Sequence, residues 1–481
     1  MLATILCTLG FMVMVFSFTM FPPLILSYYF QDGAQIAFTS SMTFSFIVGF
    51  FSWVATRKQR RELRTRDGFL LVFLFWVILC LIGAFPFYLF FETGIGYIDA
   101  LFESTSGFTT TGASILKNID ILPPSIIYYR QQLQFLGGMG IIVLAVAILP
   151  MLGVGGLQLF RIETTGPVKD NKLTPRIAQT AKVLWFIYAG ITVMCILTYW
   201  FLGMSFFDAV SYAFGTVSTG GYAPHNASLS YYPNSGIYLA ATVFMLFASI
   251  NFSLHFLVFQ RKNLSLYIQD TETRTFIALT IIFSLLIFIY LGYTQHNLAT
   301  NSLLGAIVQF TSMVSTTGFT IDYFSSWPAV IFNLVFILAF IGGCSGSTSG
   351  GLKIVRILLF IRQGIRELHK LIHPNASLVI KLNKRAVPDK ILNAVWGFLA
   401  IYILLIVVFV TLLMFTGLSL ENSIYPLLSC FSNIGPGYGL TAANFASLTP
   451  FAKILLIMAM VIGRLEVFTV LVLLTPTFWR S

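Results

Sequence analysis

Serine, threonine and glycine recur in the same order at four places in the chain, each between long apolar segments. Four stretches of fifteen residues align without a gap: DALFESTSGFTTTGA (99–113), DAVSYAFGTVSTGGY (208–222), GAIVQFTSMVSTTGF (305–319) and NSIYPLLSCFSNIGP (422–436). Each contains a quartet of Ser or Thr, then Thr or Asn, then any residue, then Gly. Because repetition at a near-constant interval indicates a repeated structural unit, we expect one unit of about a hundred residues to occur four times.

The chemistry open to these stretches is the coordination of a cation by oxygen. Carbonyl oxygens from several converging loops can replace the hydration shell of K⁺. Glycine allows the backbone conformations that such a loop requires, and hydroxyl groups can add oxygens or fix the loop to its helix. We expect K⁺ at these loops and no other metal. The expected filter residues are Thr110, Thr111, Gly112, Thr219, Gly220, Gly221, Thr316, Thr317, Gly318, Asn433, Ile434 and Gly435.

Ordinary polar turns are the alternative interpretation, since Ser, Thr and Gly are common in turns. Four ungapped matches at corresponding places favour the filter. In the second stretch the shared glycine could also be counted as Gly220. The alignment of Asp208 and the aromatic residue after Gly221 favour Gly221, in parallel with Gly318–Phe319.

A short helix should precede each quartet. Asp99, Asp208 and Asn422 are good helix N-caps, and about two turns of mostly apolar residues follow them. A helix of that length enters a bilayer without crossing it, and its partially negative C-terminal end favours a cation. Non-helical backbone at that depth is tolerated only where it is buried in protein or lines a cavity.

The composition places these stretches in a membrane protein. Of the 481 residues, 57% are hydrophobic and only 9% are charged, and no soluble domain can bury so much apolar surface. A helical span needs roughly 20 apolar residues. About ten segments meet this requirement: 2–29, 37–56, 69–91, 125–151, 181–203, 235–259, 275–294, 328–361, 390–416 and 450–476.

The net charge of +11 is distributed according to membrane topology. Basic residues cluster in 56–66, 161–182, 261–274 and 353–390, each of which follows an even-numbered span. The positive-inside rule then predicts that both termini are cytoplasmic. A nucleic-acid-binding chain would concentrate its charge on one domain instead, so we expect no nucleic-acid partner.

Few charges remain for the external side. Arg130 is one of three basic residues expected there, and Glu103 is one of several acidic residues expected near the outer mouth. Acidic groups at the mouth would raise the local concentration of cations. Helix caps and solvated loops are the alternative for each of them.

A run of ten small residues, GGCSGSTSGG (342–351), interrupts the eighth apolar segment. Glycine disfavours helix, and Ser and Thr compete for its backbone hydrogen bonds, so we expect the helix to break here, just below the third quartet. An unwound segment in mid-membrane should line a cavity. Close helix packing by small residues is the alternative. A phosphate loop is not indicated, because the signature G-x-x-x-x-G-K-[ST] is absent.

Arg464 lies about fourteen residues into the last span. A charge at that depth costs about 2.5–3.5 kcal/mol on insertion scales, so its side chain should face the protein interior. Glu466 is two residues further on and cannot meet it on one helix. We expect the guanidinium to lie in the pore beneath the filter as an electrostatic barrier; a structural ion pair with another helix is the alternative.

At the four quartets the sequence resembles the Trk/Ktr/HKT superfamily of potassium transporters, and the resemblance covers essentially the whole chain. The leading pair of spans (2–56) is similar to the Trk branch. The expected fold is an all-α polytopic membrane protein with two N-terminal helices and four M1–P–M2 repeats (outer helix, short pore helix, inner helix), potassium-channel-like and pseudo-fourfold around one pore. The expected domains are a two-helix domain 1–66, pore repeats 67–160 and 161–262, a third repeat 263–388 with a broken inner helix, and a fourth repeat 389–481.

The resemblance also implies a function: K⁺ uptake across the bacterial cytoplasmic (inner) membrane by a homodimer, with K⁺ as the transported ion and no bound cofactor. A cytosolic nucleotide-binding regulatory subunit of the TrkA type would control it. The segments 161–182 and 362–390 are candidate contacts for that subunit or for anionic lipid. The run 342–351 resembles the intramembrane gating loop of the family, and its expected gate residues, with Arg464, are Gly342, Gly343, Ser345, Gly346, Ser347, Thr348, Ser349, Gly350 and Gly351.

Two features bear on the choice between functions. Some plant relatives with sodium preference have Ser in the first filter, where this chain has Gly112, which favours K⁺; the fourth filter departs most, with Asn433, Ile434 and Pro436. A cation-coupled symporter for a small solute is the alternative, and it should have further ionisable residues in its helices. No H-E-x-x-H, G-x-S-x-G or intramembrane carboxylate pair is visible, so we expect no enzyme.

Overall fold

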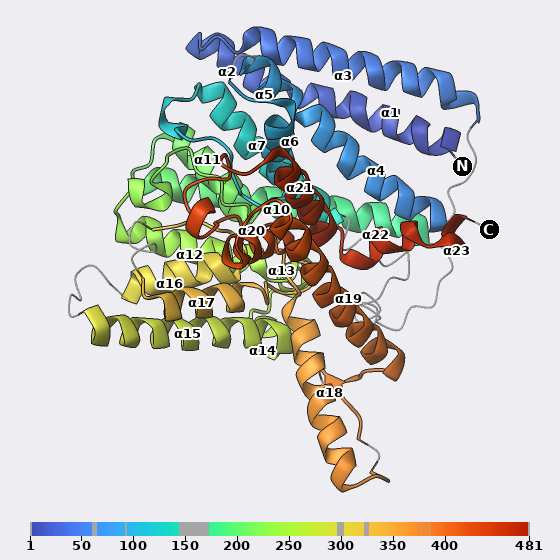
Figure 1. Ribbon diagram of the computed structural model, residues 1–481, viewed down its shortest axis with the longest axis vertical. Coiled ribbons are helices and arrows are strands. Elements are labelled where there is room, and N and C mark those ends of the chain that lie inside the picture. The colour runs from blue at the N-terminus through green and yellow to red at the C-terminus, as the bar shows by residue number, and fades with distance from the viewer. Residues whose placement is uncertain are drawn as a thin grey trace.

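Helices make up nearly all of the regular structure in the computed structural model, which describes residues 2–59, 65–91, 94–143, 173–295, 303–321, 327–376, 378–383 and 385–479 (Figure 1). The strands β1 (Lys381–Leu382) and β2 (Arg385–Ala386) form one short antiparallel pair. The basic segment 161–172 and the end of the expected span 125–151 lie outside the described residues.

Six helical segments are long and apolar enough to cross a membrane, or eight if two bent pairs are counted as one span each; this count covers the described residues only. The long helices are α1 (Leu2–Phe18), which continues into α2 (Phe21–Phe30), α3 (Gln35–Thr56), α4 (Thr65–Gly83) with α5 (Phe85–Phe90), α10 (Leu173–Phe201), α15 (Thr271–Gln295) and α19 (Asp389–Met414). Large apolar side chains on them point outward, among them Phe51 and Phe201, which are 66% and 79% exposed. Such a surface is suited to lipid, and the chain is a membrane protein.

The remaining elements are further helices and single turns. The α-helices are α7 (Pro124–Val143), α12 (Ser235–Ser249), α13 (Phe252–Arg261), α14 (Ser265–Gln269), α17 (Ala329–Ala339), α18 (Ile354–Ile372), α21 (Pro450–Arg464), α22 (Val467–Leu474) and α23 (Pro476–Trp479). The 3₁₀ turns are η1 (Arg57–Gln59), η2 (Ile119–Ile121), η5 (Ser228–Tyr231) and η7 (Gly439–Thr441).

A short helix precedes each quartet, as the sequence predicts. These helices are α6 (Tyr97–Phe108), α11 (Phe206–Val217), α16 (Leu303–Val314) and α20 (Leu420–Phe431), each of twelve residues and so three turns rather than two. Clusters of buried apolar side chains pack around all four, and neighbouring clusters share helices: Phe102 of α6 belongs to the cluster around α20, and Val308 of α16 to the cluster around α11. Each short helix is therefore packed into the core, and the cores of neighbouring short helices are connected.

The predicted N-caps are wrong by three residues. Asp208 is the third residue of α11, and Ser205 is the cap. Ser205 Oγ accepts a hydrogen bond from the Asp208 amide at 3.1 Å and donates one to Asp208 Oδ2 at 2.9 Å. Asp99 and Asn422 occupy the same third position in their helices. An acidic side chain in the first turn still complements the helix dipole, which explains why Asp resembles a cap in the sequence.

Besides the break that the sequence predicts, two further expected spans are sharply bent in the part of the chain that the structure describes. Helix α17 ends before the run 342–351, as predicted, and α18 begins after it. The pair α12 and α13 is bent by 97°, and the pair α21 and α22 by 109°, so the expected single spans 235–259 and 450–476 are not straight. Asn251 caps the second half of the former pair by accepting from the Ser253 amide at 2.8 Å.

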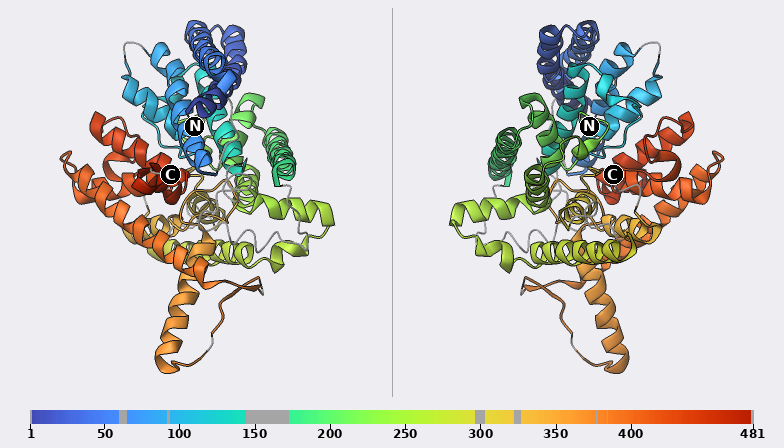
Figure 2. Two further views of the ribbon diagram at one scale, coloured as in Figure 1. Left: turned by 90° about the vertical axis from the view of Figure 1, so that its right-hand side faces the viewer. Right: turned by 90° about the vertical axis from the view of Figure 1, so that its left-hand side faces the viewer.

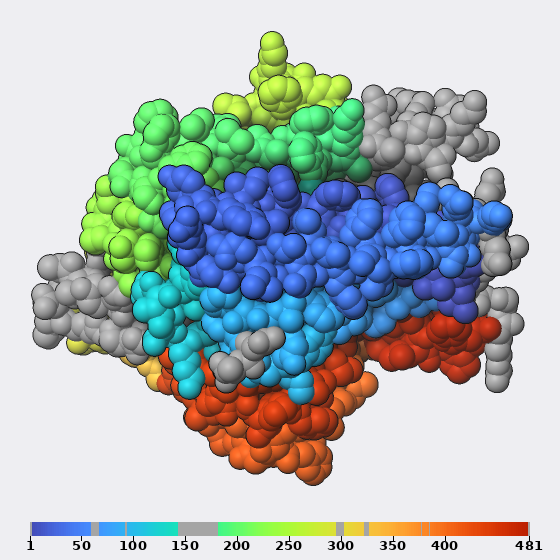
Figure 3. All heavy atoms as spheres, turned by 90° about the horizontal axis from the view of Figure 1, so that it is seen from above, coloured from blue at the N-terminus to red at the C-terminus, as the bar shows by residue number. Residues whose placement is uncertain are grey.

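The N-terminal helices lie along one edge of the molecule and α18 projects from the opposite edge (Figure 2). Seen from above, α1, α3 and α4 cover much of one face (Figure 3). Helices α1 and α3 pack tightly, since Gly10 of one lies against the backbone of Gly49 of the other. The quartets lie in the interior of the molecule, where the hydroxyl residues Thr110, Thr219 and Thr316 are fully buried.

Candidate functional site

The four quartets share one backbone conformation. The second residue of each is left-handed although none is glycine: φ is 50° at Thr110, 53° at Thr219, 58° at Thr316 and 53° at Asn433. Side chains disfavour that region, at a cost of about 1–2 kcal/mol each. Strain repeated at four equivalent places indicates that the surrounding structure imposes this conformation.

The glycine of each quartet also has a positive φ: 84° at Gly112, 73° at Gly221, 83° at Gly318 and 102° at Gly435. Gly220 has no such angle. The conformation thus assigns Gly221 to the shared position, as the alignment favours.

The third residue of each quartet fastens the loop to its helix. Its amide donates a hydrogen bond to the carbonyl oxygen five residues earlier. The distance is 2.8 Å in the first loop, from Thr111 to Ser106, and 2.9 Å in the other three: Gly220 to Gly215, Thr317 to Ser312 and Ile434 to Ser429. This is the hydrogen bond of a helix C-terminal capping motif. It directs these amides back toward the helix, so the loop's remaining main-chain groups are chiefly acceptors.

The loops contact one another in a closed ring. A Cβ on Gly112 would overlap the carbonyl oxygen of Gly220, the third residue of the second quartet. In the same way, a Cβ on Gly221 would overlap the carbonyl oxygen of Thr317 in the third quartet, and a Cβ on Gly318 would overlap that of Ile434 in the fourth. A Cβ on Gly435 would overlap the carbonyl oxygen of Thr111 in the first quartet, which closes the ring. Each shared glycine is therefore required because the third-position carbonyl of the next loop lies directly against it.

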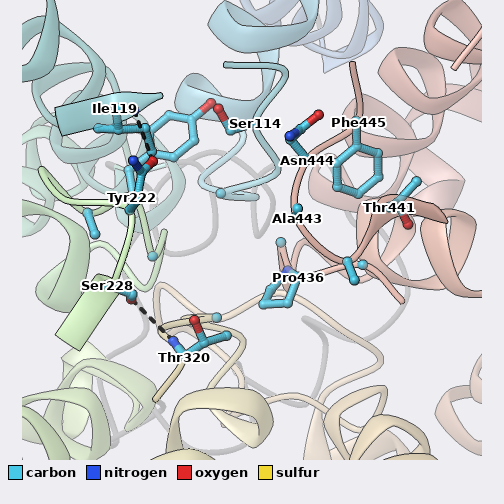
Figure 4. A pocket seen from close by; sticks show the side chains of 18 of the residues that line it. Ser114, Ile119, Tyr222, Ser228, Thr320, Pro436, Thr441, Ala443, Asn444 and Phe445 are labelled. Carbon is cyan, nitrogen blue, oxygen red and sulfur yellow. Dashed lines mark hydrogen bonds between the residues drawn. The ribbon is translucent and has the colours of Figure 1, made fainter. Parts of the chain in front are cut away.

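A pocket of about 130 Å³ opens on one side of this ring (Figure 4). All four shared glycines line it, together with residues that follow them in the chain, such as Tyr222, Thr320 and Pro436. Two of the inter-segment hydrogen bonds around it are from the Thr320 amide to Ser228 Oγ at 3.3 Å and from the Ile119 amide to Asn226 Oδ1 at 2.9 Å. Four separate parts of the sequence thus border a single hollow.

The small-residue run 342–351 is buried against the quartets. The Gly350 amide donates to Thr316 Oγ1 at 2.6 Å, and Thr348 Oγ1 donates to the Val217 carbonyl at the end of α11 at 3.2 Å. A Cβ on Gly350 would overlap the Ser432 carbonyl oxygen. The run consequently touches the second, third and fourth loops at once.

The bend between α12 and α13 accommodates this run. The amides of Cys344 and Thr348 donate to the carbonyls of Ser249 and Ala248 at 2.9 and 3.3 Å, and the Phe252 amide donates to the Gly346 carbonyl at 3.1 Å. Backbone groups released by one broken helix are satisfied by another, as the membrane interior requires.

Arg464 reaches the same run. Its Nη2 donates to the Thr348 carbonyl oxygen at 2.6 Å, and its side chain is 5% exposed. Glu466 instead pairs with Arg356 at 2.6 Å, in agreement with the expectation that it does not meet Arg464 within the helix. Among the residues that the structure describes, the partner of the Arg464 guanidinium is this carbonyl, not a carboxylate.

Comparison with known proteins gives a consistent result. The family model TrkH, described as a cation transport protein, matches residues 34–480. The chain belongs to the TrkH family. It is 45% identical to the Trk system potassium uptake protein TrkH of Halomonas elongata over all of both chains, and 46% identical to that of Escherichia coli strain K12 over 98% of each. The crystal structure of the potassium transporter TrkH from Vibrio parahaemolyticus matches all of both chains with a TM-score of 0.92 at 40% identity. The TrkH family consists of transporters, not enzymes.

An ion pair that was not predicted from the sequence supports the first loop of this TrkH-family chain. Arg130 Nε donates to Glu103 Oε1 at 2.7 Å, with both side chains buried, and the guanidinium lies 4.2 Å from the centre of the Tyr222 ring. Glu103 also accepts from the Ile115 amide at 3.0 Å. The polar run RQQLQ inside an apolar segment is the signal that the sequence offers. The sequence places both residues on the external side but does not predict that they pair, and the pair offsets the charge of the Glu103 carboxylate.

His225, four residues after Gly221, links two segments at the pocket. Its Nδ1 lies 3.1 Å from Asp120 Oδ1, its Nε2 lies 3.3 Å from Asp208 Oδ1, and its ring stacks on Tyr231 at 3.5 Å. Partial burial opposes the charged ring, but the two carboxylates outweigh burial and raise the pKa of His225 above its ordinary value.

Replacement of Arg130 by Met should destabilise the protein by about 3–5 kcal/mol, because it leaves the Glu103 carboxylate buried without its partner. Thermal unfolding in detergent measures the effect. The double variant Arg130→Met/Glu103→Gln should recover part of the loss. A single variant as stable as the wild type would contradict the inference that the pair is buried.

Replacement of His225 by Gln should remove a stabilising contribution that depends on pH. Because the folded pKa is raised, this contribution is fully present below the unfolded value of about 6.5 and is lost as the pH rises through the folded value. The difference in Tm between the wild type and His225→Gln should therefore be larger at about pH 6 than at about pH 8.5. Equal differences at the two pH values would show that the charge on His225 does not contribute.

Proposed function

We propose that this chain takes up K⁺ across the bacterial cytoplasmic membrane, with the four quartets as its selectivity filter. The observation that carries the proposal is the closed ring in which each shared glycine lies against a carbonyl of the next loop. Such a ring supplies main-chain oxygens from four sides, which is what a dehydrated K⁺ needs. The names of the relatives, Trk system potassium uptake proteins, agree with this cation.

The architecture that we propose around the filter is four M1–P–M2 repeats with pseudo-fourfold symmetry, at 67–160, 161–262, 263–388 and 389–481, after a two-helix domain at 1–66. Four short helices of equal length and four loops with matching φ angles support this division. The distribution of Lys and Arg supports cytoplasmic termini.

The proposed gate is the run 342–351 with Arg464. The run is packed beneath three of the four loops, and Arg464 is hydrogen-bonded to it. A positive charge at that point opposes the passage of a cation, and withdrawal of the run would remove both obstacles.

The proposed partners are a second copy of the chain and a cytosolic nucleotide-binding subunit of the TrkA type. Helix α18 projects from the body (Figure 1) and carries exposed apolar side chains, among them Leu368, Leu371 and Ile372 at 64%, 80% and 72% exposure. Projecting apolar side chains of this kind mark interaction surfaces. The basic residues of the same segment can meet the regulatory subunit or anionic lipid.

Liposomes that contain the purified chain provide the direct test. Reversal potentials under separate K⁺, Na⁺ and H⁺ gradients should follow K⁺. A potential that also follows H⁺ or Na⁺ would indicate coupled transport, and uptake of a small organic solute would indicate the symporter alternative.

Gly112→Ser and Gly318→Ser should each lower K⁺/Na⁺ discrimination by about tenfold or more, because a side chain forced into a positive φ costs about 1–3 kcal/mol and here also displaces a neighbouring carbonyl. Gly417→Ser is the matched control, since Gly417 has a φ of 88° but no neighbour within 4 Å. Unchanged selectivity in both filter variants would remove the basis of the filter assignment.

Arg464→Ala should raise K⁺ flux several-fold, since it removes both the charge and the hydrogen bond that holds Thr348. A deletion within 342–351 should act in the same direction. Substitution of the exposed Arg261 by Ala serves as a control for loss of one positive charge. Normal expression with unchanged flux in the first two variants would favour a packing role for this region.

A further inference from the structure

Gln134 of helix α7 forms two hydrogen bonds with the main chain of the second loop. Its side chain is fully buried. Its Nε2 donates to the Gly220 carbonyl at 2.5 Å, and its Oε1 accepts from the Tyr222 amide at 3.1 Å. The two hydrogen bonds bracket Gly221, the glycine of the ring. One amide side chain thus fixes the main chain on both sides of that glycine.

The second loop lacks a hydrogen bond between side-chain hydroxyls that the first and third loops contain. In the first loop the hydroxyl groups of Thr109 and Thr111 are hydrogen-bonded at 2.7 Å, and in the third loop those of Ser315 and Thr317 are bonded at the same distance. These bonds join the first and third residues of the quartet. The third residue of the second quartet is Gly220, which has no side chain to make such a bond.

Gln134 occupies the space that a side chain at position 220 would need. A Cβ on Gly220 would lie 2.5 Å from Cδ and 2.7 Å from Nε2 of Gln134, well inside van der Waals contact. The missing side chain of the loop and the amide that reaches in from α7 are therefore complementary. A threonine at position 220 would collide with the Gln134 amide, and glycine there without Gln134 would leave the site unfilled and its main-chain groups without their partner.

The geometry points to Gln134 as a positioning residue for cation selectivity, which supplies from a neighbouring helix the fastening that threonine supplies within the first and third loops. It acts through the Gly220 carbonyl, one of the four that close the ring. This carbonyl has two lone pairs, so the hydrogen bond from Gln134 fixes its direction and leaves one lone pair for a cation. The inference rests on the proposed function of the ring as a filter.

A double-variant experiment tests this inference. Gly220→Thr converts the second quartet and its neighbours to VSTTGY, which matches VSTTGF of the third stretch. Gln134→Ala should lower the K⁺/Na⁺ permeability ratio at least about fivefold, and Gly220→Thr should lower it as well, because the new side chain displaces the Gln134 amide. The combined variant Gln134→Ala/Gly220→Thr should recover selectivity to within about threefold of the wild type, since it has both the room and the internal hydroxyl pair.

The control is Gln132→Ala on the same helix, whose amide donates instead to the Thr19 carbonyl at 2.6 Å, away from the ring. It should keep wild-type selectivity. If Gln134→Ala does not fold, Gln134→Met preserves the volume without the hydrogen bonds and should show the same loss. A ratio within about twofold of the wild type in the Gln134 variant, or a double variant no more selective than Gly220→Thr, would overturn the inference. Absence of K⁺/Na⁺ discrimination in the wild type itself would instead reject the filter.

Discussion

The contact between glycine and a neighbouring carbonyl is the constraint on which the centre of the molecule depends. At each of the four contacts a side chain would collide with main-chain atoms of the next loop. A side chain at any one glycine would separate two loops and so disturb the positions of all four. This explains why glycine stands at the end of every quartet while the residue before it varies from Thr to Gly to Ile.

The surrounding helices follow from a second constraint, the need to satisfy every main-chain polar group within the membrane. The bend between α12 and α13 leaves carbonyls of Ala248 and Ser249 free, and the run 342–351 supplies the amides that they need. The two irregular segments therefore satisfy each other's main-chain groups. Arg464 meets the same need, because its guanidinium donates a hydrogen bond to the Thr348 carbonyl oxygen of the run.

The repeated quartets, the short helices and the break at 342–351 could all be predicted from the sequence, because each has a local pattern of small, hydroxyl or apolar residues. The bends at 250–251 and 465–466 could not, because they depend on which backbone groups another segment offers. The same holds for Gln134, Glu103 and Arg130, whose roles come from contacts between different helices. Asp208 could be placed on the correct helix but not at the correct position within it, since Ser205 and Asp208 form one reciprocal pair.

Asn433 Nδ2 donates to Thr111 Oγ1 at 2.9 Å, and Lys453 Nζ to Asp99 Oδ1 at 2.6 Å, so residues more than three hundred positions apart meet where the last loop adjoins the first. The circle of loops cannot be completed until the ribosome has made nearly the whole polypeptide. A nascent chain that stops before residue 435 has three quarters of the circle and an open side. The ring of loops is thus closed only near the end of translation, by contacts between the last loop and the first.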